Sequence, residues 1–431
     1  MKVVAFLPAK GTSERIKNKN TMMLDSKPLF LYTLEKLMTC DFIDEVYLDT
    51  ESDVMYEMAR YTGCIYLKRE QALASNATDG HSLFYNEVRQ VNADIYIQIL
   101  GTSPFISIGT IKKAVDILHN NTEYDSVVLV KREKQYLWND DIPAYDKNHV
   151  PNSKDLPDTV IETMGLYATN NYVANTLGRR YGERPYLLNA TPLESVDVNY
   201  PEDFKFAEIV AKGIRASEIN LLNFLRKLVD SAMISDILDD IGISSVISGL
   251  KCNIVGTKVF GRAKTLKIRA MKENEDFRGI YDALDSYAQV TDNDIIIVEN
   301  ECSDFAYFGE LNSMLAIRAG ASATIIGGVT RDQDAVRALN YPVFSTGYNC
   351  RDVRKRAVME NFNQKIQIQG VIISPNDLIF ADGDGIVVIP RKKEKEVISL
   401  LLNKITSERS VASEIVKNTD PKAIINKVGE F

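Results

Sequence analysis

The segment VVAFLPAKGTSERIKNKN, residues 3–20, decides how the N-terminal half of this chain folds. It begins with a short apolar run that ends at Leu7 and continues as a polar loop rich in lysine. A short apolar run closed by Pro8 and Gly11 predicts a buried strand followed by a turn. Similar runs return at 45–49, 95–100 and 126–130, with helical patterns between them at 28–38, 52–63 and 109–121. This alternation predicts an α/β fold with a mostly parallel sheet.

The loop after this first strand has the chemistry of a phosphate-binding site. Gly11 would supply the unusual φ that a tight loop needs, and Ser13 adds a small side chain and a free amide. Lys10, Arg15 and Lys19 would bring positive charge to a triphosphate. The P-loop spacing G-x-x-x-x-G-K-[ST] is absent. A solvated basic turn would explain the same charges, so the loop alone leaves both interpretations open.

The totals restrict the class of protein. A length of 431 residues predicts two or three compact units, and the net charge of −8 argues against a general nucleic-acid binder. The five cysteines form no C-x-x-C pair, so we expect buried small side chains in a reduced, cytoplasmic protein. Because there are only three histidines, catalysis would depend on carboxylates, Lys and Arg. No apolar stretch is long enough for a membrane span.

A change of composition divides the chain near residue 212 and predicts domains at 1–212 and 217–431, with a boundary between about 207 and 220. The polar stretch 133–160 is expected to be an excursion that serves as a lid or a subunit contact. Beyond the boundary, the patterns predict helices and glycine-interrupted strands. The helices are expected at 219–242 and 392–418, and the strands at 295–300, 322–328, 365–374 and 385–391.

Several motifs of the first half resemble the CMP-sialic acid synthetases and related acylneuraminate cytidylyltransferases. LPAK at 7–10, with Ser13 and Lys19-Asn20, matches the family's opening loop. GTSPF at 101–105 resembles its TSP loop, and ESVDVNYPEDFKFAE at 194–208 resembles its closing motif. Over about 210 residues, the resemblance implies a Rossmann-like, GT-A-like nucleotidyltransferase. Its reaction would use CTP and Mg²⁺ to activate a 2-keto-3-deoxy sugar acid as the CMP derivative, releasing pyrophosphate.

The same resemblance assigns roles to individual residues. Nucleotide binding falls to Leu7, Ala9, Lys10, Gly11, Ser13, Arg15, Lys19 and Asn20. Catalysis is assigned to Lys19, Asn20 and Arg69, and sugar-acid binding to Arg69, Thr102 and Ser103. Asp197 is implied as a metal ligand, and Asn199 would face the same side if both lie on one strand.

Two departures from the family pattern affect the substrate more than the reaction. Asn199 stands where a second carboxylate is usual, and Leu100 stands where a glutamine commonly precedes the TSP loop. Gln98 lies two residues away on the same side of the expected strand. The competing hypothesis for this half is a sugar nucleotidyltransferase that uses UTP or GTP, although those enzymes usually carry a G-x-G-T-R-type loop.

In the second half, the stretch FGELNSMLAIRAGASATIIGGVTRD, residues 308–332, is the most informative. Twenty residues (311–330) separate Glu310 from the Arg331-Asp332 pair. A helix that opens at Glu310 would present free N–H groups to an anion. The pair could hold a carboxylate with the arginine and a cation with the aspartate. Because surface Arg-Asp neighbours are common, spacing alone favours a structural role.

This stretch and its surroundings resemble the RraA-like family, which includes the class II 4-hydroxy-4-methyl-2-oxoglutarate aldolases. Residues 229–242, 258–269 and 374–390 carry the rest of the resemblance, with Asn376 where glycine is usual. It implies an αββα-type domain in which Glu310 and Asp332 hold Mg²⁺ or Mn²⁺. Arg331 would bind pyruvate and act in catalysis, while the backbone of Gly309, Leu311 and Asn312 would hold the pyruvate carboxylate.

The two resemblances suggest how the halves could cooperate. Adding pyruvate enolate to an aldehyde gives a 4-hydroxy-2-oxo acid, which is the skeleton that a CMP-sugar-acid synthetase consumes. The second domain would then make or break down the substrate of the first. The alternatives are a non-catalytic protein-binding module and an oligomerisation domain. We expect a homo-oligomer, with dimer contacts from the first domain and trimer contacts from the second, and neither nucleic-acid nor membrane partners.

Overall fold

The computed structural model describes residues 1–75, 77–416, 420, 422 and 423. It divides into unit 1, Met1–Ala211, and unit 2, Lys212–Phe431, which are described separately. The predicted end of the last helix at 417–418 and the end of the predicted second domain at 424–431 lie outside the described residues. No helix within the described residues has both the length and the apolar character needed to cross a membrane.

Unit 1 is built on a seven-stranded sheet with the order β11-β7-β10-β6-β1-β4-β5. All strands run parallel except β10, which is antiparallel to both of its neighbours. The strands are β1 (Val3–Pro8), β4 (Glu45–Thr50), β5 (Ile65–Lys68), β6 (Ile95–Ile99), β7 (Ser126–Glu133), β10 (Thr159–Asn170) and β11 (Pro185–Asn189). The predicted strands in this half are confirmed, whereas β5, β10 and β11 were not predicted.

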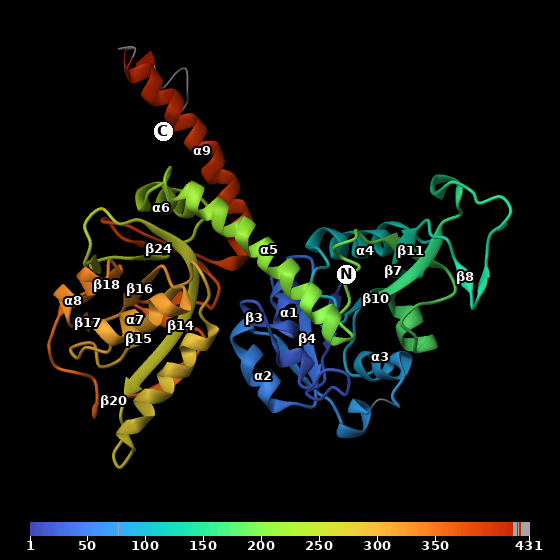
Figure 1. Cartoon of the computed structure of the whole chain (residues 1–431), viewed down its shortest axis with the longest axis horizontal. Helices are drawn as coiled ribbons and strands as arrows, with labels where there is room; N and C mark the ends of the chain where they lie inside the picture. Colours follow the sequence, from blue (N-terminus) through green and yellow to red (C-terminus); the bar gives the residue numbers. More distant parts are fainter. Residues whose placement is uncertain (76, 417–419, 421, 424–431) are drawn as a thin grey trace. The chain divides into compact units, whose positions relative to one another are not determined.

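Helices cover both faces of this sheet (Figure 1). They are α1 (Leu29–Met38), α2 (Asp53–Ala59), α3 (Gly80–Val88), α4 (Ile108–Asn120) and α5 (Pro201–Leu225), and α5 continues into unit 2. Side chains of α1, α2 and α4 pack on one face, and those of α3 pack on the other. Because side chains alternate along a strand, Leu7 of β1 faces the first group and Phe6 faces α3.

Two details of unit 1 differ from the predictions or extend them. Pro28 caps α1 from an extended conformation (ψ 141°), so it lies just before the first helical turn and not in it. Two-residue strands, β2 (Met23–Leu24) and β3 (Lys27–Pro28), precede α1. The expected excursion at 133–160 is a largely exposed arm that carries the small hairpin of β8 (Trp138–Asn139) and β9 (Ile142–Pro143) (Figure 1).

Unit 2 contains a nine-stranded mixed sheet with the order β12-β24-β23-β14-β15-β16-β18-β13, and β20 also pairs with β14. The long strand β14 (Val259–Ala270) joins a parallel part, β15, β16 and β18, to an antiparallel part, β23 and β24. The other strands of the sheet are β12 (Val246–Ile247), β13 (Lys251–Cys252), β15 (Ile295–Asn300), β16 (Ala323–Ile326), β18 (Val343–Ser345), β20 (Ala357–Phe362), β23 (Leu378–Ala381) and β24 (Ile386–Ile389).

Shorter elements complete unit 2. The strand pairs outside the sheet are β17 (Val329–Thr330) with β19 (Gly347–Tyr348), and β21 (Ile366–Ile368) with β22 (Val371–Ile373). The helices are α6 (Ser231–Asp240), η6 (Phe277–Gln289), α7 (Glu310–Ala319), α8 (Gln333–Ala338) and α9 (Glu394–Val416), of which α6 and α9 pack together (Figure 1). The helical run predicted at 219–242 is interrupted between α5 and α6, and the predicted strand at 365–374 is a hairpin.

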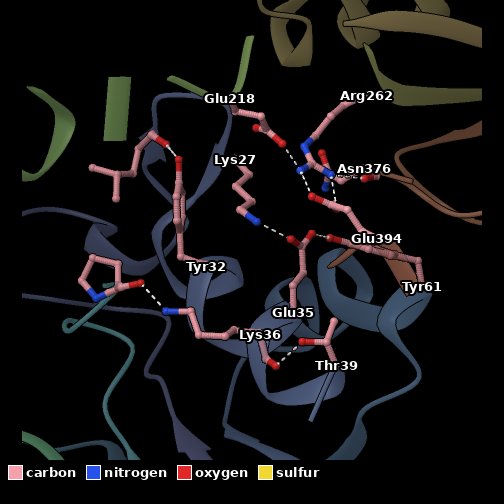
Figure 2. A network of polar contacts seen from close by, with 12 residues as sticks. Lys27, Tyr32, Glu35, Lys36, Thr39, Tyr61, Glu218, Arg262, Asn376 and Glu394 are labelled. Atoms are coloured by element: carbon pink, nitrogen blue, oxygen red, sulfur yellow. Dashed lines mark hydrogen bonds and ion pairs between the residues drawn. The ribbon is translucent and has the colours of Figure 1, made fainter. Parts of the chain in front are cut away.

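Each unit contains a network of charged side chains that bind one another (Figure 2). In unit 1, the Glu35 carboxylate of α1 accepts hydrogen bonds from Lys27 and from the Tyr61 hydroxyl. In unit 2, Arg262 of β14 forms a bidentate pair with Glu394 of α9 (2.9 and 3.0 Å) and also binds Glu218. Such charge-assisted hydrogen bonds hold the side chains of Glu35 and Arg262 in place.

Candidate functional site

The strand order of unit 1 marks where a ligand is expected. From β1 the chain proceeds to β4 and β5 on one side, and then crosses back to β6 on the other side. In open α/β sheets, ligands bind outside the carboxyl ends of the strands at such a switch point. The loop that begins at Ala9 follows β1, and the 101–105 loop follows β6, so both sequence motifs lie at this edge.

Lys19 connects the two halves of the first candidate site. It lies in a short 3₁₀ turn, Lys19–Thr21, and is 9% exposed. Its Nζ donates to the Val198 carbonyl at 2.5 Å, across 179 residues of sequence. Burial lowers the pKa of this ammonium group, while the Asp197 carboxylate opposes that effect. The opening loop and the closing motif are therefore joined around a buried cation.

The side chains of Asp197 and Asn199 are in direct contact. The Asn199 Nδ2 donates to Asp197 Oδ2 at 2.5 Å, and Arg15 Nη1 donates to Asn199 Oδ1 at 3.2 Å. The predicted strand at this position is wrong, because residues 196–199 lie in no regular element. An Asp203 cap on the backbone of Asn199 (3.0 Å) and the Lys19–Val198 bond hold the segment instead.

The role predicted for Gly11 requires a correction. Gly11 is not among the residues with positive φ; within this loop Asn18 takes that conformation (φ 55°). Glycine fits here because an added Cβ would lie 2.9 Å from the Ser52 Cβ. The Gly11 N–H donates to Glu51 Oε1 at 2.7 Å, so this amide is already bound to a carboxylate, which sequence reasoning missed.

The remaining nucleotide-binding candidates lie on or next to the loop. Leu7 packs its side chain in the core and could reach a ligand only through its backbone, and the Ala9 N–H donates to the Asp49 carbonyl at 2.9 Å. Asn20 is buried and donates to the Lys10 carbonyl at 2.8 Å, which ties the two ends of the loop together. Ser13 lies between them and is half-buried.

The 101–105 loop is held by hydrogen bonds from α1 and from the closing motif. Lys36 of α1 donates to the carbonyls of Pro104 (2.8 Å) and Ile106 (2.5 Å). The Thr102 carbonyl accepts the Val198 N–H at 2.9 Å, while Ser103 is buried. These contacts bring the TSP motif to the same closing segment that Lys19 contacts.

Arg69 is a buried member of a charged cluster. Its guanidinium binds both carboxylate oxygens of Asp49 (3.0 and 2.7 Å), and both side chains are almost fully buried. Nearby, Glu87 accepts from Gln98 Nε2 at 2.5 Å, and burial, reinforced by Asp49, raises the pKa of Glu87 well above its ordinary value. Gln98 is fully buried, and its Oε1 has no hydrogen-bond partner among the described residues.

Unit 2 brings its predicted residues together at the start of α7. The Glu310 N–H donates to Asp332 Oδ2 at 3.1 Å, and Arg331 Nε lies 3.6 Å from the same oxygen. Asp332 adopts a left-handed conformation (φ 56°) directly after Arg331, which follows β17. An added Cβ at Gly309 would lie 2.4 Å from Asp332 Oδ2, so only glycine allows this approach.

The surroundings of this second site include one group that sequence reasoning missed. Asp352 Oδ2 accepts from Arg331 Nη1 at 2.7 Å, and no motif signalled it. Asn312 donates to the Tyr307 carbonyl at 2.9 Å, and Leu311 is exposed. The arginine therefore lies between two carboxylates, half-exposed to solvent.

Comparisons with known proteins agree with this division. Residues 4–157 match a family model described as cytidylyltransferase, and residues 231–388 match one described as Aldolase/RraA. The chain therefore has one segment similar to cytidylyltransferases and one similar to RraA-like proteins.

Individual relatives show the same two sequence similarities. The Protein DlpA of Legionella pneumophila is 32% identical over 191 residues, which are 43% of this chain and 31% of DlpA. A Halalkalibacterium halodurans protein, named provisionally as a 4-hydroxy-4-methyl-2-oxoglutarate aldolase, is 29% identical over 42% of this chain and 82% of its own. The CMP-N,N'-diacetyllegionaminic acid synthase of Legionella pneumophila is 26% identical over 48% of this chain and 95% of its own.

The donor atoms at the two sites differ in how well they fit a divalent cation. In unit 1, Asp197 Oδ1 is buried and has no hydrogen-bond partner among the described residues, which suits a cation ligand. In unit 2, Asp332 Oδ2 already accepts the Glu310 N–H. No group of three or more His, Cys, Asp or Glu side chains able to hold a metal is found in either unit among the described residues. A metal at either site would then need further oxygen ligands from amides, water or substrate.

Proposed function

We propose that unit 1 is a CTP-dependent cytidylyltransferase that activates a 2-keto-3-deoxy sugar acid. The observation that supports this most is the buried Lys19, bound to the segment that carries Asp197 and anchored in the loop after β1. A cation and a carboxylate held together at a switch point suit a nucleoside triphosphate accompanied by a metal ion. The cytidylyltransferase match over residues 4–157 supports the choice of CTP.

The proposed reaction needs positioning and charge neutralisation. The anomeric hydroxyl oxygen of the sugar acid bonds to the α-phosphorus, the bond from that phosphorus to the β-phosphate bridging oxygen breaks, and pyrophosphate leaves while the hydroxyl proton passes to solvent. Lys10, Arg15 and Lys19 would bind the phosphates, and Asn20 would hold the loop in place. Asp197 and Asn199 would hold Mg²⁺, which would supply charge neutralisation.

Pyrophosphate release measured with each of the four nucleoside triphosphates tests this function. The acceptor panel comprises N-acetylneuraminate, N,N'-diacetyllegionaminate and 3-deoxy-manno-octulosonate, whose cytidylyltransferases are among the relatives. We expect turnover with CTP and one or more of these acids. A preference for UTP or GTP would favour the competing class of sugar nucleotidyltransferase, and no turnover with any pair would contradict the proposal.

For unit 2 we propose a metal-dependent pyruvate aldolase. The contacts among Glu310, Arg331 and Asp332 at the start of α7 support it, because an arginine beside a helix N-terminus suits a keto-acid carboxylate. Incubation with Mg²⁺ or Mn²⁺ and oxaloacetate should release pyruvate. If no pyruvate forms from oxaloacetate or from 4-hydroxy-2-oxo acids, a non-catalytic or oligomerisation role is the better explanation.

A further inference from the structure

The loop 178–184 in unit 1 carries an arginine that the proposed mechanism does not use. The Arg180 guanidinium lies over the ring of Tyr167 of β10, with its carbon 5.0 Å from the ring centroid. The Tyr167 hydroxyl is itself bound to Glu162, and its ring stacks on Tyr181 at 6.5 Å. The contact with the ring restricts where the guanidinium can lie.

Two further features fix the position of Arg180. Its backbone N–H donates to His81 Nδ1 at 3.2 Å, which ties the loop to the first turn of α3. Gly80, the first residue of α3, has no side chain where the guanidinium lies, because an added Cβ would approach the Arg180 Nη1 to 2.3 Å. The backbone of α3 is thus shaped to admit the arginine.

The charge of Arg180 is held in place without being neutralised. Its Nε is buried and has no hydrogen-bond partner among the described residues. Among all residues that the structure describes, no carboxylate lies within ion-pair distance of Arg180. Its neighbour Arg179, in contrast, pairs with Glu183 at 3.1 Å. A positioned guanidinium that leaves a donor unsatisfied is costly unless a ligand completes it.

The location agrees with a substrate contact. Tyr167 pairs with Gln98, the residue before the last one of β6, so its ring is near the carboxyl edge of the sheet. The α3 helix runs from this edge back toward the start of β6, which places Gly80 there as well. On the strength of the proposed cytidylyltransferase function, we propose that Arg180 binds the carboxylate of the sugar acid and sets specificity for acidic substrates.

Kinetics of Arg180→Met test this assignment, with Arg179→Met as the matched control at the next position. For the acid that the wild type uses best, we expect the KM of Arg180→Met to rise about 10- to 100-fold, the effect of losing a charge-assisted hydrogen bond. The KM for CTP should stay within about twofold in both variants. The Arg179→Met variant should resemble the wild type because its side chain is half exposed.

Two more measurements separate a ligand contact from a structural one. Gly80→Ala keeps the charge but displaces it, so it should raise the same KM by a smaller factor, and Arg180→Lys should recover part of the loss. The methyl ester of the acid, used as an inhibitor, should bind the wild type more weakly than the acid does, and this difference should vanish in Arg180→Met. If wild-type turnover is absent, the proposed function fails. Normal turnover with an unchanged KM in Arg180→Met overturns the assignment of Arg180 alone.

Discussion

The two candidate sites of this chain are built in opposite ways. In unit 1, Lys19 and Asn20 are buried, and Lys19 binds the Val198 carbonyl, which lies 179 residues away in sequence. In unit 2, Glu310 and Asp332 are exposed, and Arg331 is held by ion pairs with residues that share its solvent exposure. Burial fixes the geometry of charged groups and strengthens their fields, whereas exposed pairs are screened and individually weak. The first site is therefore organised by the fold, and the second depends more on what binds to it.

The largest effect should come from removing the carboxylate of the first site. We expect Asp197→Ala to lower turnover at least about 1,000-fold, because both the metal ligand and the negative charge next to Lys19 are lost. Pyrophosphate release with CTP measures the effect. The far-UV circular dichroism should stay close to wild type, which separates a loss of turnover from a loss of the fold. Substantial activity in this variant would remove Asp197 from the metal site, and Asn199→Ala would then identify the ligand that remains.

A stability comparison tests the difference in burial directly. Arg69→Met would leave the Asp49 carboxylate buried without its cation, so we expect a loss of about 3–5 kcal/mol in the free energy of unfolding. Arg331→Met removes an arginine whose ion pair with Asp352 is more than one-third exposed on both sides, and should cost under about 1 kcal/mol. Urea denaturation of both variants measures the contrast. Equal losses would mean that the two sites do not differ in the way proposed here.

These contrasts also explain what the sequence could predict. Short apolar runs with period two or full burial predicted β1, β4, β6 and β7, because a buried strand imposes a local pattern. The strand β10 gave no such pattern. Its first half is mostly exposed, its register shifts between Glu162 and Tyr167, and Met164 adopts a positive φ (58°), all of which depend on tertiary contacts.

The site residues also divide into those that the sequence could predict and those that it could not. Loop motifs next to strand ends identified Lys19 and Arg331, because a strand end fixes where the next residues lie. Two carboxylates of the sites were missed, namely Glu51, which binds the Gly11 N–H, and Asp352, which binds Arg331. Both lie in ordinary charged stretches that give no signal. Asn376, which stands where the RraA-like pattern has glycine, adopts φ 66° and so preserves the left-handed turn, as asparagine can.

In unit 2, Arg331→Met should reduce pyruvate formation about 100-fold, since the keto-acid carboxylate would lose its charge-assisted partner. Pyruvate released from oxaloacetate with Mg²⁺ or Mn²⁺ measures the loss. The Arg318→Met variant, at an exposed position of α7, is the control and should behave as wild type. CTP-dependent pyrophosphate release should be the same in all three proteins. A parallel loss of both activities would show that Arg331 acts on the whole chain and not on its own site.

The smallest effect concerns Glu194, which secures the segment before Asp197. Its carboxylate accepts from the backbone of Thr191 (2.9 Å) and Ser107 (3.0 Å) and from the Thr110 hydroxyl (2.5 Å). Burial would raise the pKa of this carboxyl group, but the hydrogen bonds outweigh it and lower the pKa to about 2. A lowered folded-state pKa means that the carboxylate stabilises the fold fully above its ordinary value of 4.5, and that this stabilisation disappears as the pH falls from 4.5 toward 2.

Glu194→Gln should therefore lower the free energy of unfolding at pH 7 by about 2 kcal/mol, because the amide nitrogen cannot accept the bonds that one carboxylate oxygen made. The difference from wild type should shrink below pH 4.5 and nearly vanish close to pH 2. Urea denaturation at a series of pH values measures it. Because Glu194 is 4% exposed, added salt should change the difference little, whereas an exposed pair would be screened. A difference that persists unchanged at low pH would show that Glu194 stabilises the fold by packing and not as a carboxylate. Buried charged groups would then contribute less to the stability of unit 1 than the comparison with unit 2 implies.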